Sequence, residues 1–149
     1  MATTTGSTNT FNSWVGYANQ AANLGSDTFI FFLTTSSWTP NQATHSLLSD
    51  VTNELSGNGY SRQTATGVTF TQSGAVWTFD CNNPVFTASG GSLVHRYWGI
   101  FDDSIAGDPL VAYGLSDTTA GGTDVTTTAG NTHTVNVHAS GLITHTRVS

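Results

Sequence analysis

The side chains best suited to chemistry in this sequence are its histidines and its nine acidic residues. The histidines are His45, His95, His133, His138 and His145. Zinc needs three or four converging ligands. His133 and His138 are an odd number of residues apart on one predicted strand, so they point to opposite faces. His95 and His145 belong to different predicted strands and would meet only if those strands paired. We therefore expect polar surface positions for the histidines and no metal site.

An acidic turn over residues 102–108 is the best candidate for a bound cation. Loops that hold hard cations alternate carboxylates and use a glycine for the bend. Asp103 and Asp108 are five residues apart, however, and no glutamate follows that could bind with both oxygens. We favour a β-turn in which aspartate side chains accept hydrogen bonds from nearby backbone N–H groups.

The residues needed for catalysis are few. The sequence has no lysine, and Glu54, its single glutamate, is expected on a solvent-exposed helix face. It contains neither a phosphate-binding loop, which needs a lysine, nor a Gly-x-Ser-x-Gly motif. A Ser/His/Asp triad is compatible with the composition, because its members meet only in space. The scarcity of Lys and Glu weighs against it, so we expect no enzyme, no catalytic residue and no cofactor.

The aromatic residues fall into two groups. One group alternates along predicted strands and is expected in the core: Phe70, Trp77, Phe79, Trp98 and Phe101. The other lies near helix ends or loops, where aromatic side chains act as interface anchors or as stacking surfaces for sugars. Together with two apolar neighbours, this second group forms the predicted protein interface: Phe11, Trp14, Val15, Tyr17, Trp38 and Tyr60.

Two short helices are expected near the N-terminus. Residues 1–10 lack periodicity and are predicted to form an extended arm. Four apolar residues then recur at helical spacing, Phe11, Trp14, Val15 and Ala18, before Gly25 ends the pattern. A second helix is predicted over residues 41–55, where Leu47, Leu48, Val51 and Leu55 share a face.

The remainder of the chain is predicted to be β-strand. The expected strands are 28–35, 65–72, 75–81, 84–88, 93–102, 109–115, 125–128, 132–138 and 142–148. Short strands with turns every 8–12 residues indicate a β-sandwich or jelly-roll. We therefore expect a mainly β protein, with an N-terminal arm and short helix over residues 1–24 and one β-sandwich domain over residues 25–149.

Composition narrows the set of partners. Charged residues make up 8% of the chain, against about 25% in an average protein, and the formal net charge is -6. Three scattered arginines form no basic stripe, so we expect neither nucleic acid nor membrane as a partner. The first ten residues do not resemble a secretion signal, and the lone Cys81 is expected as a small buried hydrophobe. Burying a neutral, hydroxyl-rich surface against another protein has a low desolvation cost, which favours a protein that works within an assembly.

Six segments occur in a familiar order. They are TFIFFLTT (28–35), SGNGYSRQ (56–63), LVHRYWGIFD (93–102), GDPLVAYGL (107–115), AGNT (129–132) and ASGLIT (139–144). The first five are similar to YLALLTT, GGGYARQ, ATHWAIFD, GGNLLYYGAL and AGDT of a family of small structural proteins from tailed bacteriophages. The resemblance covers roughly the last four-fifths of the chain. Residues 41–55 form a longer insertion than the family leads us to expect.

The resemblance implies a virion protein that is assembled in the host cytoplasm and has no catalytic residues. We expect a capsid decoration or cement protein, a homo-oligomer bound to the major capsid protein or to other virion proteins. The residue 1–10 arm would reach across a neighbour. A tail, baseplate or head-fibre component is the alternative from the same particle. A carbohydrate-binding module, using Trp14, Trp38 or Tyr60, is an alternative from a different class.

Overall fold

The computed structural model describes residues 2–4, 8–117, 119 and 121–146, and it is mainly β with one short α-helix. This confirms the predicted fold class. The helical elements are α1 (Trp14–Gln20) and a 3-10 turn, η1 (Leu48–Asp50). The strands are β1 (Ala2–Thr4), β2 (Asn9–Thr10), β3 (Phe29–Thr34), β4 (Gln63–Thr64), β5 (Thr69–Ser73), β6 (Val76–Asp80), β7 (Val85–Thr87), β8 (Leu93–His95), β9 (Tyr97–Asp102), β10 (Leu110–Leu115), β11 (Val125–Thr127), β12 (Thr132–Val135) and β13 (Ile143–Thr146).

A five-stranded sheet with the order β2-β10-β9-β3-β4 forms the centre of the domain. Its middle strands read as nearly continuous apolar runs because both of their faces are buried. Gly99 lies opposite Phe32 in the register, and a Cβ there would sit 2.2 Å from the phenyl ring. Glycine at this position therefore lets the ring lie flat over the neighbouring strand.

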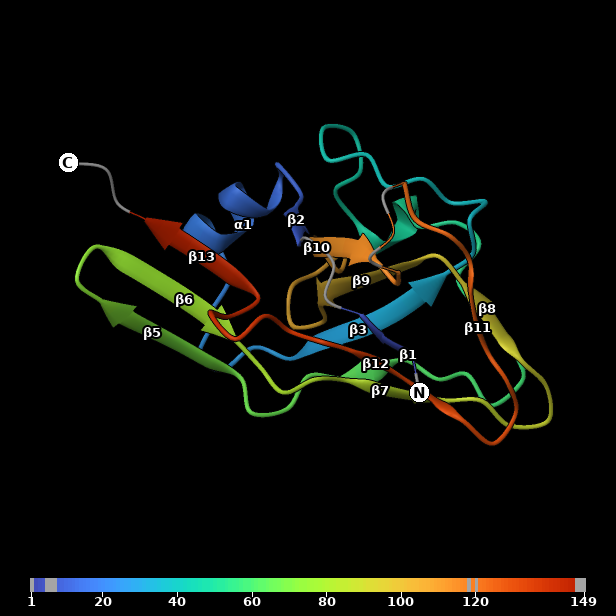
Figure 1. Ribbon diagram of the computed structural model, residues 1–149. Coiled ribbons are helices and arrows are strands. Elements are labelled where there is room, and N and C mark those ends of the chain that lie inside the picture. The colour runs from blue at the N-terminus through green and yellow to red at the C-terminus, as the bar shows by residue number, and fades with distance from the viewer. Residues whose placement is uncertain (1, 5–7, 118, 120, 147–149) are drawn as a thin grey trace.

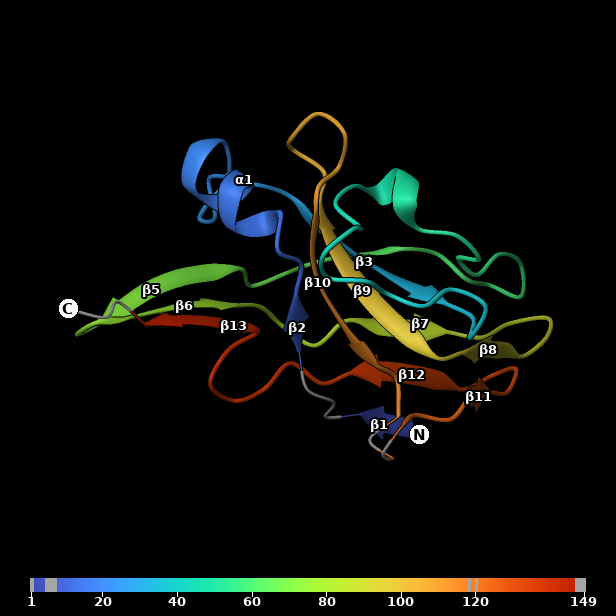
Figure 2. The ribbon, with the colours of Figure 1, turned by 90° about the horizontal axis from the view of Figure 1, so that it is seen from above.

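The alternation of β3 supplies two separate cores. Phe29, Phe31 and Leu33 point into the larger core, while Phe32 points to the other face and packs near Trp38. The larger core is closed from below by short strands, among them β7, β8 and β12. Figure 2 shows β7 and β12 lying under β3 and β9, which gives the two layers of a sandwich.

A second three-stranded sheet, β13-β6-β5, projects beyond the sandwich (Figure 1). The strands β5 and β6 form a hairpin whose turn begins at Gly74, with φ 58°. Near the sandwich, Phe79 of β6 is buried against Phe29, with ring centroids 4.7 Å apart. Farther out, Phe70 and Trp77 are each 37% exposed. The prediction that these two aromatics are core residues is therefore wrong, because the hairpin extends past the layer that would cover them.

The predicted helix over residues 41–55 is also wrong, since only the three-residue turn η1 forms there. The segment satisfies its backbone in other ways. The Asp50 carboxylate accepts hydrogen bonds from the N–H groups of Ser46 and Leu47, and the Leu48 N–H donates to the Asp108 carbonyl. Leu48 and Val51 pack on the smaller core and Leu55 on the larger, so the apolar residues do not share one face.

The N-terminal segment forms strands within the same chain. Strand β1 runs parallel to β12, and β2 is antiparallel to β10. Phe11 continues this docking, since its N–H donates to the Val111 carbonyl at 3.1 Å and its ring is fully buried. The described residues of the predicted arm thus extend two sheets of the domain itself.

Candidate functional site

An apolar groove lies between α1 and one face of the projecting sheet. Its volume is about 880 Å³. The helix and the loop after it supply one wall, and strands β5, β6 and β13 supply the other (Figure 1). The lining residues are Thr10, Trp14, Val15, Ala18, Asn19, Ala22, Asn23, Leu24, Gly25, Phe70, Trp77, Phe79, Ile143, Thr144 and His145.

The strand register explains why the sheet wall is apolar. Phe70, Phe79 and Ile143 are paired across the three strands, so their side chains share one face. Trp77 and His145 belong to the same face because they lie two residues further along their strands. The opposite face carries hydroxyls, with Thr71, Thr78 and Thr144 in one row. We call the first of these faces the aromatic face.

The exposed aromatic pair at the outer end of this face is preorganised. The rings of Phe70 and Trp77 stack with centroids 4.8 Å apart and an interplanar angle of 22°. They are diagonal neighbours on β5 and β6, a separation that aromatic side chains bridge well. The pair therefore presents a fixed apolar surface to a partner and loses little side-chain entropy on binding.

The helical wall is anchored to the core from below. Trp14 is buried and meets the Phe29 ring edge-on, with centroids 6.2 Å apart. The next residue, Val15, is 48% exposed, the highest value among the large hydrophobic residues of the described chain. A seven-residue helix is too short to be stable alone, so the Trp14 contact holds α1 in place over the sheet.

Among the described residues, no Asp, Glu, Lys or Arg lines the groove. The polar residues of its lining are Thr10, Asn19, Asn23, Thr144 and His145. Neutral walls of this kind suit an apolar or weakly polar partner, because such a partner gives up little hydration on entry. The arrangement offers a binding surface.

The six residues predicted as an interface have different fates. Phe11, Trp14 and Trp38 are buried in the protein's own cores, so the expectation that they are exposed anchors is wrong for these three. They are needed locally to fix the N-terminal segment and residues 35–50 onto the central sheet. Val15 lines the groove, and Tyr17 is partly buried against the larger core.

Tyr60, the sixth predicted residue, belongs to a polar cluster. Its hydroxyl accepts a hydrogen bond from the Leu33 N–H at 3.1 Å and donates to Glu54 at 2.7 Å. Arg62 binds both Glu54 oxygens, each at 2.8 Å. Burial raises the pKa of Tyr60 above its usual value. Glu54 therefore organises the 54–62 loop, and its predicted place on a solvent-exposed helix face is wrong.

The groove could not be predicted from the sequence, because its key residues have the pattern of ordinary core residues. Phe70 and Trp77 alternate as core residues do, and only the length of chain available to cover them decides otherwise. One sequence feature does set their strands apart. The stretch 63–79 contains no charged residue, although a β-hairpin at the surface commonly carries some.

Two histidines meet inside the sandwich, which contradicts their predicted surface positions. The rings of His95 and His133 are fully buried with centroids 4.3 Å apart. His95 contacts Ser116 Oγ at 2.8 Å and Thr127 Oγ1 at 3.4 Å, whereas neither ring nitrogen of His133 has a hydrogen-bond partner among the described residues. Burial lowers the pKa of His95 to about 3 and that of His133 to about 4. Both rings are therefore neutral at pH 7.

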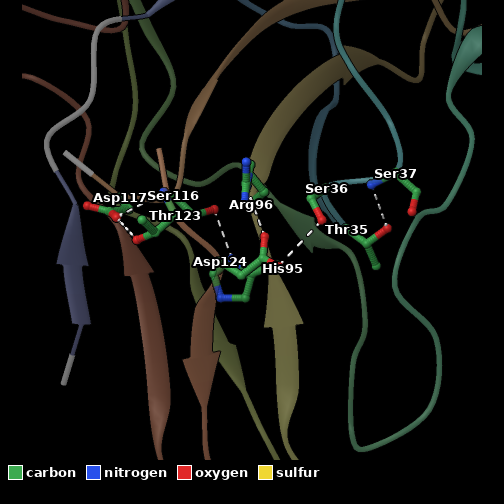
Figure 3. A network of polar contacts seen from close by, with 9 residues as sticks. All are labelled: Thr35, Ser36, Ser37, His95, Arg96, Ser116, Asp117, Thr123 and Asp124. Carbon is green, nitrogen blue, oxygen red and sulfur yellow. Dashed lines mark hydrogen bonds and ion pairs between the residues drawn. The ribbon is translucent and has the colours of Figure 1, made fainter. Parts of the chain in front are cut away.

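The loop next to this pair carries a polar network (Figure 3). Arg96 Nε donates to Asp124 at 2.9 Å, and the Ser36 hydroxyl reaches the same carboxylate. Asp117 accepts hydrogen bonds from Thr119 and Thr123. These contacts hold Asp117, Thr119 and residues 121–124 near the Ser116–His95 end of the sandwich. Among the described residues, no group of three or more His, Cys, Asp or Glu could hold a metal ion.

The acidic turn contains a buried carboxylate. Asp102 Oδ1 accepts the Ser104 N–H at 2.9 Å, as expected for a β-turn of this type, while Oδ2 is buried and accepts no hydrogen bond from the described residues. Burial and, secondarily, the nearby Asp27 raise the pKa of Asp102 to about 6. Asp108 takes the turn's left-handed conformation at φ 53°.

Comparison of the chain with protein-family models, with curated proteins and with solved structures finds no match. Over the described residues, no helix has the length and apolar character required to cross a bilayer. The site therefore has to be interpreted from its own geometry.

Proposed function

We propose that this chain is a structural protein of a tailed-bacteriophage particle, and that it acts as a capsid decoration or cement protein. In this role it binds the major capsid protein, or another virion protein, through the groove between α1 and the aromatic face. The sequence resemblance to small phage structural proteins supports the phage particle as the location, and the groove is the surface that would attach to it.

The observation that carries the proposal is a neutral apolar groove bordered by exposed hydrophobic side chains. Val15, Phe70 and Trp77 are exposed, and none of the described lining residues is an acid, a lysine or an arginine. A contiguous apolar surface on an otherwise polar protein is typical of a site that a protein partner covers. Binding energy that exists only on the assembled shell stabilises that shell by linkage.

The decisive experiment compares phage particles assembled with and without this protein. We expect particles that lack it to release DNA at a lower temperature. They should also be less resistant to low ionic strength. Adding the purified chain should restore resistance up to saturation of its sites. Unchanged resistance, together with no binding of the purified chain to the particles, would rule out the cement role.

A matched pair of variants tests whether the groove is the attachment surface. Val15→Asp places a charge at the groove, and Val94→Asp places the same charge on β8, which is outside the groove lining. Both valines are similarly exposed, at 48% and 44%, so both variants should fold. We expect only Val15→Asp to lose binding to particles. Equal binding by both variants would contradict attachment through the groove.

The alternative from the same particle is a tail, baseplate or head-fibre component, which would use the same groove on a different neighbour. Imaging the labelled protein on intact particles separates these locations. Label on the head shell supports the decoration role, whereas label confined to the tail or to projecting fibres transfers the proposal to that structure.

A carbohydrate-binding module remains a second candidate because Trp77 is exposed near the amides of Asn19 and Asn23. Trp14 and Trp38 are buried and cannot stack on a sugar, so Trp77 takes their place in this hypothesis. A glycan array screened with the purified protein and with Trp77→Ala tests it. Glycan binding that disappears in Trp77→Ala would favour this function over attachment to a capsid protein.

A further inference from the structure

We propose that two copies of this chain pair through the outer edge of β5, antiparallel and about a two-fold axis at Thr71, to form one continuous six-stranded sheet. The strand order across the pair would be β13-β6-β5 followed by β5-β6-β13 of the second copy. This inference goes beyond attachment to a particle, because it concerns contacts between copies of the chain and stands whether or not a particle is present.

The first observation is the openness of the β5 edge. Strand β5 ends its sheet, and all five of its residues are exposed. On its outer side it has no strand partner within the described parts of the chain. It is also longer than every other strand that ends a sheet there, since those have two to four residues. A free edge of this kind is a template for pairing with another chain.

The second observation is the absence of the usual protection. Proteins block an exposed edge with lysine, proline, inward charges or a bulge. Residues 63–79 contain no charged residue and no proline, and the β5–β6 register is continuous from Thr69 to Ser73. Two copies that each carry a net charge of -6 repel each other. Residues 63–79 carry none of this charge, so two copies can meet there without bringing like charges together, which favours a second copy as the occupant.

The backbone of β5 fits a two-fold pairing. A two-residue hairpin turn closes on a hydrogen-bonded pair, here Ser73 and Val76, so alternate residues from Ser73 use their N–H and C=O groups within the hairpin. Phe70 and Gln72 therefore direct theirs outward. With Thr71 opposite its own copy, Phe70 pairs with Gln72 of the second copy and the reverse. This register forms four backbone hydrogen bonds and leaves no outward group of these two residues unpaired.

The side chains agree with the same register. Phe70 and Gln72 both lie on the aromatic face, so each phenyl ring would pack beside a glutamine of the other copy. The two Phe70 rings become diagonal neighbours at about 7–8 Å, a distance that aromatic pairs use. Together with the stacked Trp77 rings, they join the two aromatic faces into one surface. The threonines of the opposite face meet as neutral hydroxyls.

Sedimentation analysis of the purified 15.6 kDa chain tests the pairing. We expect a dimer whose fraction rises with protein concentration. Thr71→Lys places two like charges directly opposite each other at the axis and should weaken dimerisation about tenfold. Thr146→Lys makes the same change at the exposed opposite edge of the same sheet and should leave the dimer unchanged. A wild-type chain that stays monomeric at every concentration would overturn the proposal.

Cysteine crosslinking tests the register itself. Residues opposite each other in a non-hydrogen-bonded antiparallel pair have Cα atoms about 4.5 Å apart, which a disulfide can span. Thr71→Cys should therefore give a covalent dimer on mild oxidation. Thr69→Cys should not, because its two copies would be about 14 Å apart along the strands. Wild type controls for the buried Cys81. Crosslinking of Thr69→Cys but not of Thr71→Cys would refute the axis at Thr71.

These outcomes can be told apart from those for the proposed function. A Thr71→Lys chain that is monomeric but still saturates particles would support the pairing and leave the groove as the attachment site. A dimeric wild-type chain that does not bind particles would support the pairing and refute the cement role.

Discussion

The central sheet and the projecting sheet both contain aromatic strand residues, but they differ in how far those residues are buried. Strand β6 alternates aromatic with smaller residues, and β9 carries aromatic residues on both of its faces. In β9, Trp98 and Phe101 are buried, on opposite faces of the sheet. In β6, Phe79 is buried but Trp77, two residues nearer the turn, is exposed. The sequence pattern sets the side of the strand, whereas coverage by a second layer decides burial. Aromatic residues that a second layer covers stabilise the fold, whereas those left uncovered are available for binding.

The largest expected effect breaks the covered side of this comparison. Phe31→Ala removes a fully buried ring between the two layers, within 6.1 Å of the Trp98 ring centroid. Large-to-small changes of this kind cost about 3–5 kcal/mol in free energy of unfolding, because the cavity cannot be refilled. Urea unfolding followed by circular dichroism measures the loss. A loss no larger than that of Phe70→Ala would show that the two sheets are equally packed.

The next effect sharpens the comparison through pH, because the buried histidines belong to the sandwich alone. A histidine whose pKa in the folded protein lies below its unfolded value near 6.5 binds a proton more readily when unfolded. The free energy of unfolding that depends on the two histidines is therefore fully present above pH 6.5. It decreases as the pH falls toward their pKa values in the folded protein, about 3 and about 4. Each histidine contributes about 1.4 kcal/mol per pH unit in this window.

Asp102 acts in the opposite direction. Its folded pKa of about 6 lies above the usual value of 3.8, so its protonation stabilises the fold as the pH falls below 6. From pH 6.5 to pH 5 the net loss should be about 2 kcal/mol. Unfolding at several pH values measures this slope. His133→Phe should make it shallower, while His138→Phe, which changes an exposed histidine, should not. A slope unaffected by His133→Phe would contradict the buried pair as its source.

A smaller effect compares one glycine from each sheet. Gly99→Ala would place a methyl group within 2.2 Å of the Phe32 ring, which is itself enclosed by Trp38 and Phe101. The ring cannot move without disturbing the smaller core, so we expect a cost of about 1–3 kcal/mol. Gly74→Ala in the projecting hairpin meets no atom within 4 Å, and its cost of about 1 kcal/mol comes from φ 58° alone. Thermal unfolding of both variants tests this order.

The sequence predicted most strands and the β-sandwich because both depend on local alternation. Residues 29–34, 97–102 and 110–115 form strands inside their predicted ranges. The errors arose where long-range contacts decide. His95 and His133 meet because β8 and β12 belong to different sheets of one layer, which spacing along the chain does not encode. Residues 41–55 carry a helical pattern. Their backbone instead forms hydrogen bonds with the Asp50 carboxylate and with the distant backbone of Asp108 and Leu110.

The candidate site was harder to predict than the fold. The helix prediction correctly placed a short apolar helix near the N-terminus, yet Phe11 and Trp14 are the residues that pack that segment onto the core. Of the six residues predicted as an interface, only Val15 lines the groove as an exposed side chain. Helical periodicity marks an apolar stripe, and it does not distinguish the part that the protein covers from the part left to a partner.

The smallest expected effect on stability is at the exposed end of the comparison. Trp77→Ala removes a ring that is 37% exposed and contacts mainly Phe70, so we expect a loss below about 1 kcal/mol in free energy of unfolding. Binding to particles should nevertheless fall strongly, because anchors of this type dominate interface energy. Measuring both quantities on one preparation separates the roles. A loss of several kcal/mol in stability would place Trp77 with the covered aromatics, and the difference between the two sheets would then be one of degree.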